Sequence, residues 1–102
     1  SFENDVQPIL NAHCNYGGCH DFYEEAGQLD LTADVSHSEL VNVDAFLFDG
    51  QKRVIPSDTV NSVLVKLIKG LETPAMPLNQ QGLPDHKIHT ITKWISEGAL
   101  DN

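Results

Sequence analysis

Two cysteines and a histidine lie close together in the chain, at Cys14, Cys19 and His20. A pair of cysteines that ends directly in Cys-His can fix haem covalently, because two thiols add to the haem vinyl groups and the adjacent imidazole ligates the iron. The usual spacing has two residues between the cysteines, whereas this chain has the four residues Asn-Tyr-Gly-Gly. Two other interpretations stay open on these residues alone. They are a disulfide that closes a short loop, and a zinc site that uses both cysteines, His20 and a further histidine, His13 or His37.

The single methionine of the chain, Met76, lies in the sequence Thr-Pro-Ala-Met-Pro. A lone methionine on an exposed proline loop makes a poor core residue, but its thioether is a soft ligand that can complete haem iron opposite His20. The alternative is a methionine that packs this loop onto the core. Because Met76 occurs together with the cysteine motif, its interpretation as an iron ligand is favoured.

The chain is small and acidic. It has 102 residues, with 6 Lys and Arg against 15 Asp and Glu, so the formal net charge is -9. This balance excludes a protein that binds the phosphate backbone of nucleic acids and argues against binding to an anionic membrane surface. Hydrophobic residues make up 40% and charged residues 21%, which is typical of one globular domain with a small core.

Neither a membrane span nor a signal peptide is evident. No apolar run reaches the length of about 18 residues that a span needs, and the first residues, Ser-Phe-Glu-Asn-Asp, lack the layout of a signal peptide. We therefore expect either a cytosolic chain or one from which a leader or anchor has been removed.

Apolar periodicity predicts an all-α chain with helices at residues 2–13, 36–43, 60–69 and 85–97. Pro8 predicts that the first helix begins late or bends there, and Gly70 and Gly98 are placed to end the last two. Ser36 or Ser38 is the expected N-cap of the second helix. Two long loops are expected at residues 15–27 and 71–84, and a turn with short extended arms at 45–56.

The order of these motifs resembles a small class I c-type cytochrome, and is most similar to the planctomycete-type cytochrome c domain. The resemblance covers nearly the whole chain, and it rests on the sequences FENDVQPIL, GQLDL, VIPSD, NSVL, AMP and ITKWISEGA in this order around the cysteine motif. It implies one domain over residues 1–102, with about four helices and long loops around one covalently bound haem c. It also implies thioether links at Cys14 and Cys19, and iron ligation by His20 and Met76.

The resemblance further implies that the first and last helices cross, with Val6, Ile9 or Leu10 near Trp94. The expanded cysteine spacing departs from the family, and the flexible pair Gly17-Gly18 is placed to let the two extra residues bulge out.

Taken as a cytochrome, the chain is an electron carrier and not an enzyme, either by itself or as a relay domain cut from a larger enzyme. Covalent haem attachment in bacteria implies a periplasmic or otherwise exported location. A thioether ligand raises the reduction potential and a negative surface lowers it, so a positive, moderate potential is expected. Acidic residues near the motif would steer the protein towards a redox partner with a basic patch; these are Asp21, Glu24, Glu25 and Asp30.

Two rival functions remain from the sequence. One is a haem sensor or peroxidase-like domain with an open distal site, and the other is a haem-free disulfide or zinc module that uses Cys14, Cys19 and His20. Among other residues, His13 is expected to face solvent at a helix end. The surface is also expected to hold His37, His86 and His89. Arg53 is interpreted as a solvated loop charge, or with Lys52 as a partner for a haem propionate.

Overall fold

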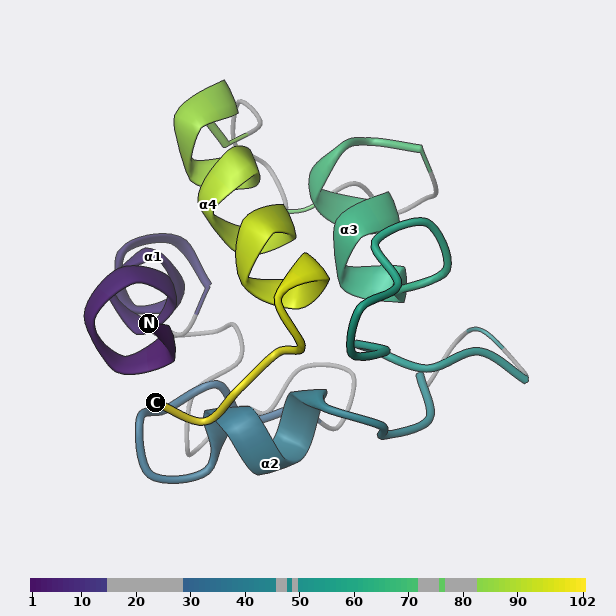
Figure 1. Ribbon diagram of the computed structural model, residues 1–102, viewed down its shortest axis with the longest axis horizontal. Helices are drawn as coiled ribbons and strands as arrows, with labels where there is room; N and C mark the ends of the chain where they lie inside the picture. The colour runs from purple at the N-terminus through teal and green to yellow at the C-terminus, as the bar shows by residue number, and fades with distance from the viewer. Residues whose placement is uncertain (15–28, 46–47, 49, 72–75, 77–82) are drawn as a thin grey trace.

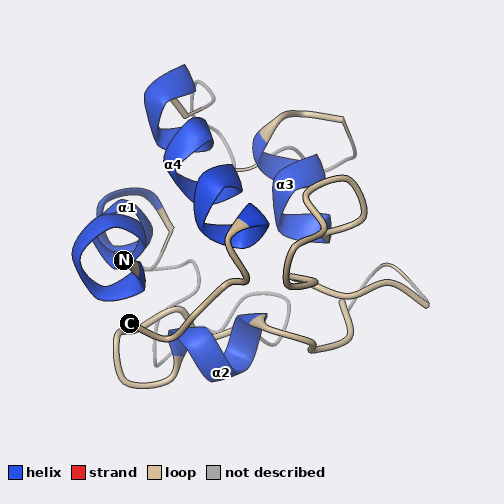
Figure 2. Cartoon of the chain, viewed as in Figure 1, coloured by secondary structure: helices blue, strands red, loops and turns tan. Residues whose placement is uncertain are grey.

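Short helices separated by long connections make up the fold. A computed structural model describes residues 1–14, 29–45, 48, 50–71, 76 and 83–102. In these ranges a π-helical turn, η1 (Phe2–Val6), leads into four α-helices (Figure 1), namely α1 (Gln7–His13), α2 (Ser36–Leu40), α3 (Val63–Ile68) and α4 (Asp85–Ser96). The same ranges contain isolated β-bridges but no strand (Figure 2). The predicted all-α class is therefore confirmed.

The first helix changes its hydrogen-bond register next to a proline. Residues 2–6 form a π-helical turn with Glu3 and Asp5 in its first turn, where the helix dipole favours carboxylates. The α-helical register begins at Gln7, with Pro8 in the first turn of α1, where its missing N–H group is tolerated. The predicted interruption at Pro8 is thus a change from π- to α-helical geometry.

Helix α2 is shorter than predicted and does not have the predicted cap. Its N-cap is Val35, and no side chain caps it. The Ser36 side chain is instead fully buried, and its hydroxyl donates to Gln7 Oε1 on α1. The Ser38 hydroxyl donates to the Val35 carbonyl. A serine that finds a partner elsewhere in the fold cannot cap its own helix, so the N-cap prediction was wrong.

Helices α3 and α4 each end just before a glycine, as predicted. Gly70 has φ 72° and Gly98 has φ 109°, both in the left-handed region that ends helices at little cost for glycine. Helix α3 begins at Val63 and not at residue 60, because its N-cap Ser62 has an extended backbone with ψ 120°. The Asp58 carboxylate accepts the N–H groups of Val60 and Asn61 in the preceding turn.

The core lies where η1 packs against α4 and α4 against α3. In Figure 1, α1 is seen nearly end-on and α4 nearly side-on, so the first and last helices cross, as the resemblance predicts. The contact is made through Phe2, whose ring centroid lies 4.9 Å from that of Trp94. Both rings are buried within one apolar cluster; among its other members are Val6, Ile9, Leu10, Leu31, Leu40, Val54, Val65, Ile68, Ile91 and Ile95.

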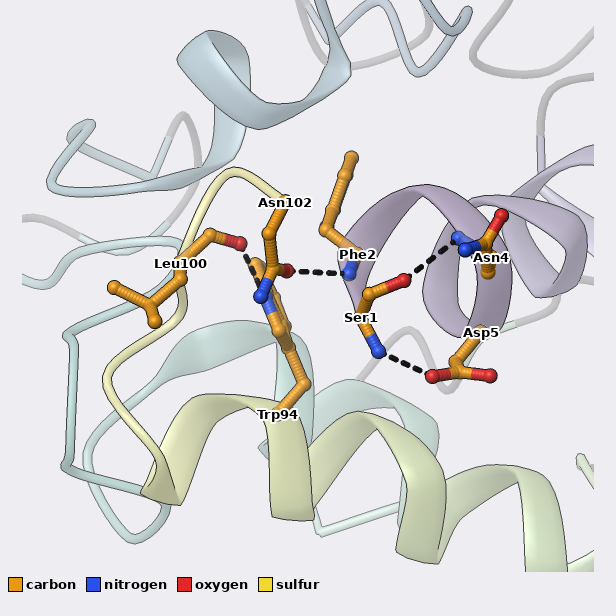
Figure 3. A network of polar contacts seen from close by, with 7 residues as sticks. All are labelled: Ser1, Phe2, Asn4, Asp5, Trp94, Leu100 and Asn102. Carbon is orange, nitrogen blue, oxygen red and sulfur yellow. Dashed lines mark hydrogen bonds and ion pairs between the residues drawn. The ribbon is translucent and has the colours of Figure 1, made fainter.

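The segment after α4 returns to the start of the chain. Asn102 Oδ1 accepts the backbone N–H of Phe2 at 2.8 Å, and the Leu100 carbonyl accepts the Trp94 indole N–H at 2.9 Å (Figure 3). The first and last residues consequently lie side by side over the Phe2–Trp94 contact. In the described ranges, no helix has the length and apolar character needed to cross a bilayer.

Removal of the Ser36 hydroxyl should destabilise the fold. Ser36→Ala would leave the buried Gln7 Oε1 without its donor, which typically costs about 1–3 kcal/mol. Urea denaturation should show this loss of unfolding free energy, whereas Ser38→Ala, at an exposed position, should change it by less than about 0.5 kcal/mol. Equal effects of the two substitutions would contradict the buried contact between α1 and α2.

The Asp58 turn should make folding sensitive to acid. The Asn61 side-chain amide and backbone N–H, with smaller contributions from Val60 and Lys66, hold the pKa of Asp58 below its ordinary value. Because the folded-state pKa is the lower one, the ionised carboxylate stabilises the fold above the unfolded-state pKa. This stabilisation is lost as the pH falls through the folded-state pKa. Carboxyl NMR titration should report the lowered pKa, and Asn61→Ala should move it back upwards; an unchanged value would contradict the turn geometry.

Candidate functional site

Cys14 lies at the end of α1 and is held by it. The residue is the C-cap of α1, and its backbone N–H donates to the Leu10 carbonyl at 2.8 Å. Ile9 and Leu10 anchor the same helix in the core. The Cys14 side chain is partly buried and packs against the core cluster. The rest of the motif, including Gly17-Gly18, Cys19 and His20, lies outside the described residues.

Met76 contacts the same core from a different part of the chain. Its backbone N–H donates to the Leu67 carbonyl at 3.0 Å, which ties it to the end of α3. Its side chain is partly buried and packs against the core cluster, as the alternative interpretation of this methionine predicts. The prolines on either side of Met76 lie outside the described residues.

Cys14 and Met76 are both among the partly buried side chains that pack against the core cluster. The full set is Cys14, Leu29, Val41, Leu64, Met76 and Ile88. A haem is a large apolar ring that needs apolar walls and soft ligands. Of the residues predicted for the haem, the structure describes Cys14, whose thiol could bond to a vinyl group, and Met76, whose thioether could ligate the iron, and both contact apolar side chains. By contrast, no group of three or more His, Cys, Asp or Glu side chains placed to hold a metal ion occurs in the described part of the chain.

His37 has a structural position that the sequence did not reveal. Its Nε2 lies 2.8 Å from the Ala99 carbonyl oxygen. Its ring is edge-on to Phe2, with centroids 5.3 Å apart, and to Trp94 at 6.0 Å. The prediction of a plain surface histidine was wrong, because its partners come from both ends of the chain and leave no local signal. His86 and His89 are exposed, as predicted.

His13, the residue before Cys14, does not simply face solvent. It is partly buried, and its Nε2 lies 2.8 Å from Lys87 Nζ on α4. Both histidines considered as a further zinc ligand, His13 and His37, thus have hydrogen-bonding partners elsewhere in the fold.

Arg53 and Lys52 do not act as a pair. Arg53 is buried, with 9% of its surface exposed, and its Nη1 donates to the Glu39 carbonyl at 2.8 Å. Lys52 bonds to the exposed Asp44, and holds the pKa of that carboxyl below its ordinary value through the hydrogen bond and its charge. The interpretation of Arg53 as a solvated loop charge was therefore wrong; a backbone carbonyl from α2, distant in sequence, explains its burial.

Asp30 is not part of an acidic surface. It is 7% exposed, and its Oδ1 accepts the backbone N–H and the hydroxyl of Thr32 at 2.9 and 2.7 Å. The carboxylate thus stabilises a local turn instead of facing a partner. The other acidic residues predicted beside it, Asp21, Glu24 and Glu25, lie outside the described residues.

A hollow of about 370 Å³ opens elsewhere, beside the Phe2–Trp94 contact. It is bordered by Asp5, Lys93, Trp94 and Asn102, among others. Cys14 and Met76, the two predicted haem residues that the structure describes, do not line it.

Comparison of this chain with family models, curated proteins and solved structures gave no match.

Proposed function

We propose that this chain is a monohaem c-type cytochrome that carries single electrons between redox partners. Haem c would be attached through Cys14 and Cys19, and its iron would be ligated by His20 and Met76. The observation that supports this most directly is the position of Cys14 and Met76. These two residues, far apart in the sequence, border the same apolar core.

The bound haem would supply an iron that changes between the ferric and ferrous states. The task of the chain is to hold the ligands still while this charge changes. Buried residues on α1 fix Cys14, and the hydrogen bond to the Leu67 carbonyl fixes the backbone of Met76. Because Cys14 and Met76 are only partly buried, a haem held by them would remain accessible to a partner. The proposed role is that of an electron carrier, alone or as a relay domain of a larger enzyme, and not of an enzyme.

The charge of the chain supports a partner with a basic patch. Four of its six Lys and Arg side chains donate to groups within the protein; they are Lys52, Arg53, Lys66 and Lys87. Positive charge on the surface is therefore largely engaged in internal contacts, while the net charge is -9. We expect electrostatic steering towards basic surfaces and an association rate that falls with salt. A periplasmic or otherwise exported location belongs to the same proposal.

Haem attachment is tested by intact mass and a pyridine haemochrome spectrum of the chain made together with a cytochrome c maturation system. We expect the protein mass to increase by that of one haem, and the spectrum to be that of a haem bound through two thioether links. Cys14→Ser and Cys19→Ser should each give the spectrum of a single link, and the double variant should lack covalent haem. A colourless wild-type protein of unmodified mass would falsify the proposal; its zinc content and thiol count would then separate a zinc module from a disulfide.

Ligation by Met76 is tested by carbon monoxide binding to the reduced protein. The wild type should bind little, because a ligand occupies the sixth position. Met76→Ala should bind close to one equivalent and have a lower reduction potential, because the thioether stabilises ferrous iron. Leu71→Ala, at an exposed apolar position on the preceding segment, is the matched control and should behave as wild type. Ready binding by the wild type would instead favour a sensor or peroxidase-like domain with an open site.

A further inference from the structure

The hollow beside the Phe2–Trp94 contact is bordered by charges of opposite sign that do not pair with each other. Lys93 on α4 and Glu97, the C-cap of this helix, both border it, and both side chains are exposed. Residues four positions apart on a helix are neighbours, with Cβ atoms about 5–6 Å apart. The ion pairs found among the described residues nevertheless involve other side chains. An ammonium and a carboxylate therefore stand one helical turn apart at the hollow, each without the other as its partner.

The other polar groups around the hollow are already engaged within the fold. Asp5, on η1, is paired with the Ser1 amino group (Figure 3). Asn102 Oδ1 accepts the Phe2 N–H, and the Trp94 indole N–H donates to the Leu100 carbonyl. The charges that remain for a ligand are thus those of Lys93 and Glu97.

Apolar side chains supply the rest of the lining. Val6 and Trp94 are buried there, whereas the Leu100 side chain borders the hollow with 58% of its surface exposed. The volume of about 370 Å³ falls within the range of about 300–1,000 Å³ that is usual for small-molecule sites. An apolar lining with a few polar groups at fixed places is the usual composition of such a site.

We infer that this hollow binds an α-amino acid with an apolar side chain. The ammonium of the ligand would pair with Glu97 and its carboxylate with Lys93. Both charged groups of an α-amino acid are attached to one carbon atom, so they suit two protein side chains that are one helical turn apart. The apolar side chain of the ligand would lie against Leu100.

The charge of the whole chain favours such a dipolar ligand over an anion. The net charge of -9 repels an anion at long range, whereas a ligand without net charge does not meet this repulsion. The inference does not depend on haem, because neither Cys14 nor Met76 borders the hollow.

Ligand analogues test the inference by calorimetry and by NMR of the indole N–H of Trp94, the single tryptophan of the chain. L-leucine should bind saturably and shift this signal. N-acetyl-L-leucine lacks the ammonium and L-leucinamide lacks the carboxylate, so each should bind about tenfold or more weakly, because one charged hydrogen bond is lost. No saturable binding of L-leucine at millimolar concentrations would overturn the inference. Binding of L-leucinamide as tight as that of L-leucine would also overturn it, since the site would then select a cation.

Protein variants assign the two charges. Lys93→Gln should weaken L-leucine binding about tenfold and bring the affinities of L-leucine and L-leucinamide close together. Glu97→Gln should do the same for L-leucine and N-acetyl-L-leucine. Lys69→Gln and Glu3→Gln make the same charge changes at exposed positions that do not border the hollow, so both should bind as wild type.

Equal weakening by these controls would indicate a general effect of charge and would overturn the inference. Haem content, measured on the same samples, should be the same in the wild type and all four variants. The leucine titrations therefore decide this inference whether or not the chain carries haem.

Discussion

The packing of Phe2 against Trp94 is the contact on which the rest of the described structure depends. It joins the first helical segment to the last, with the two ring centroids 4.9 Å apart. The segment after α4 supplies hydrogen-bonding partners for the polar atoms around this contact. The Ala99 carbonyl lies beside the His37 Nε2, and the Leu100 carbonyl accepts the Trp94 indole N–H. In the described part of the chain, every buried side-chain nitrogen and oxygen has a hydrogen-bonding partner. An aromatic contact with its polar groups satisfied can fix two helices in a protein too small for a large core.

The same pair of helices is fixed at a second place, where His13 meets Lys87. Two points of attachment hold the end of α1, and Cys14 with it, at the edge of the core. Cys14 and Met76 are two of the partly buried side chains that pack against this small core. In the proposed cytochrome, haem would complete this core, so the group that carries the electron would also contribute to the stability of the fold.

Sequence patterns predicted the features that depend on neighbouring residues. The apolar spacing of Ile91, Trp94 and Ile95 placed α4 within one residue of its observed end, and Gly70 and Gly98 ended their helices as expected. The Cys-His motif and the lone methionine singled out candidate ligands by their chemistry alone. Two of these candidates, Cys14 and Met76, are among the described residues and lie at one core, while the ligation itself stays a proposal.

Only the tertiary structure decided the positions of the polar side chains. Ser36 bonds to Gln7, His37 to Ala99 and Lys87 to His13, across 29, 62 and 74 positions of the sequence. Arg53, expected at the surface, is buried for the same kind of reason, since it donates to the Glu39 carbonyl. Backbone preferences and helical periodicity act over a few residues, so the sequence by itself determined the helices, the glycine ends of α3 and α4, and the candidate chemistry. A polar group can be buried only where the fold supplies a donor or acceptor to match it, and that match depends on segments that meet only after folding.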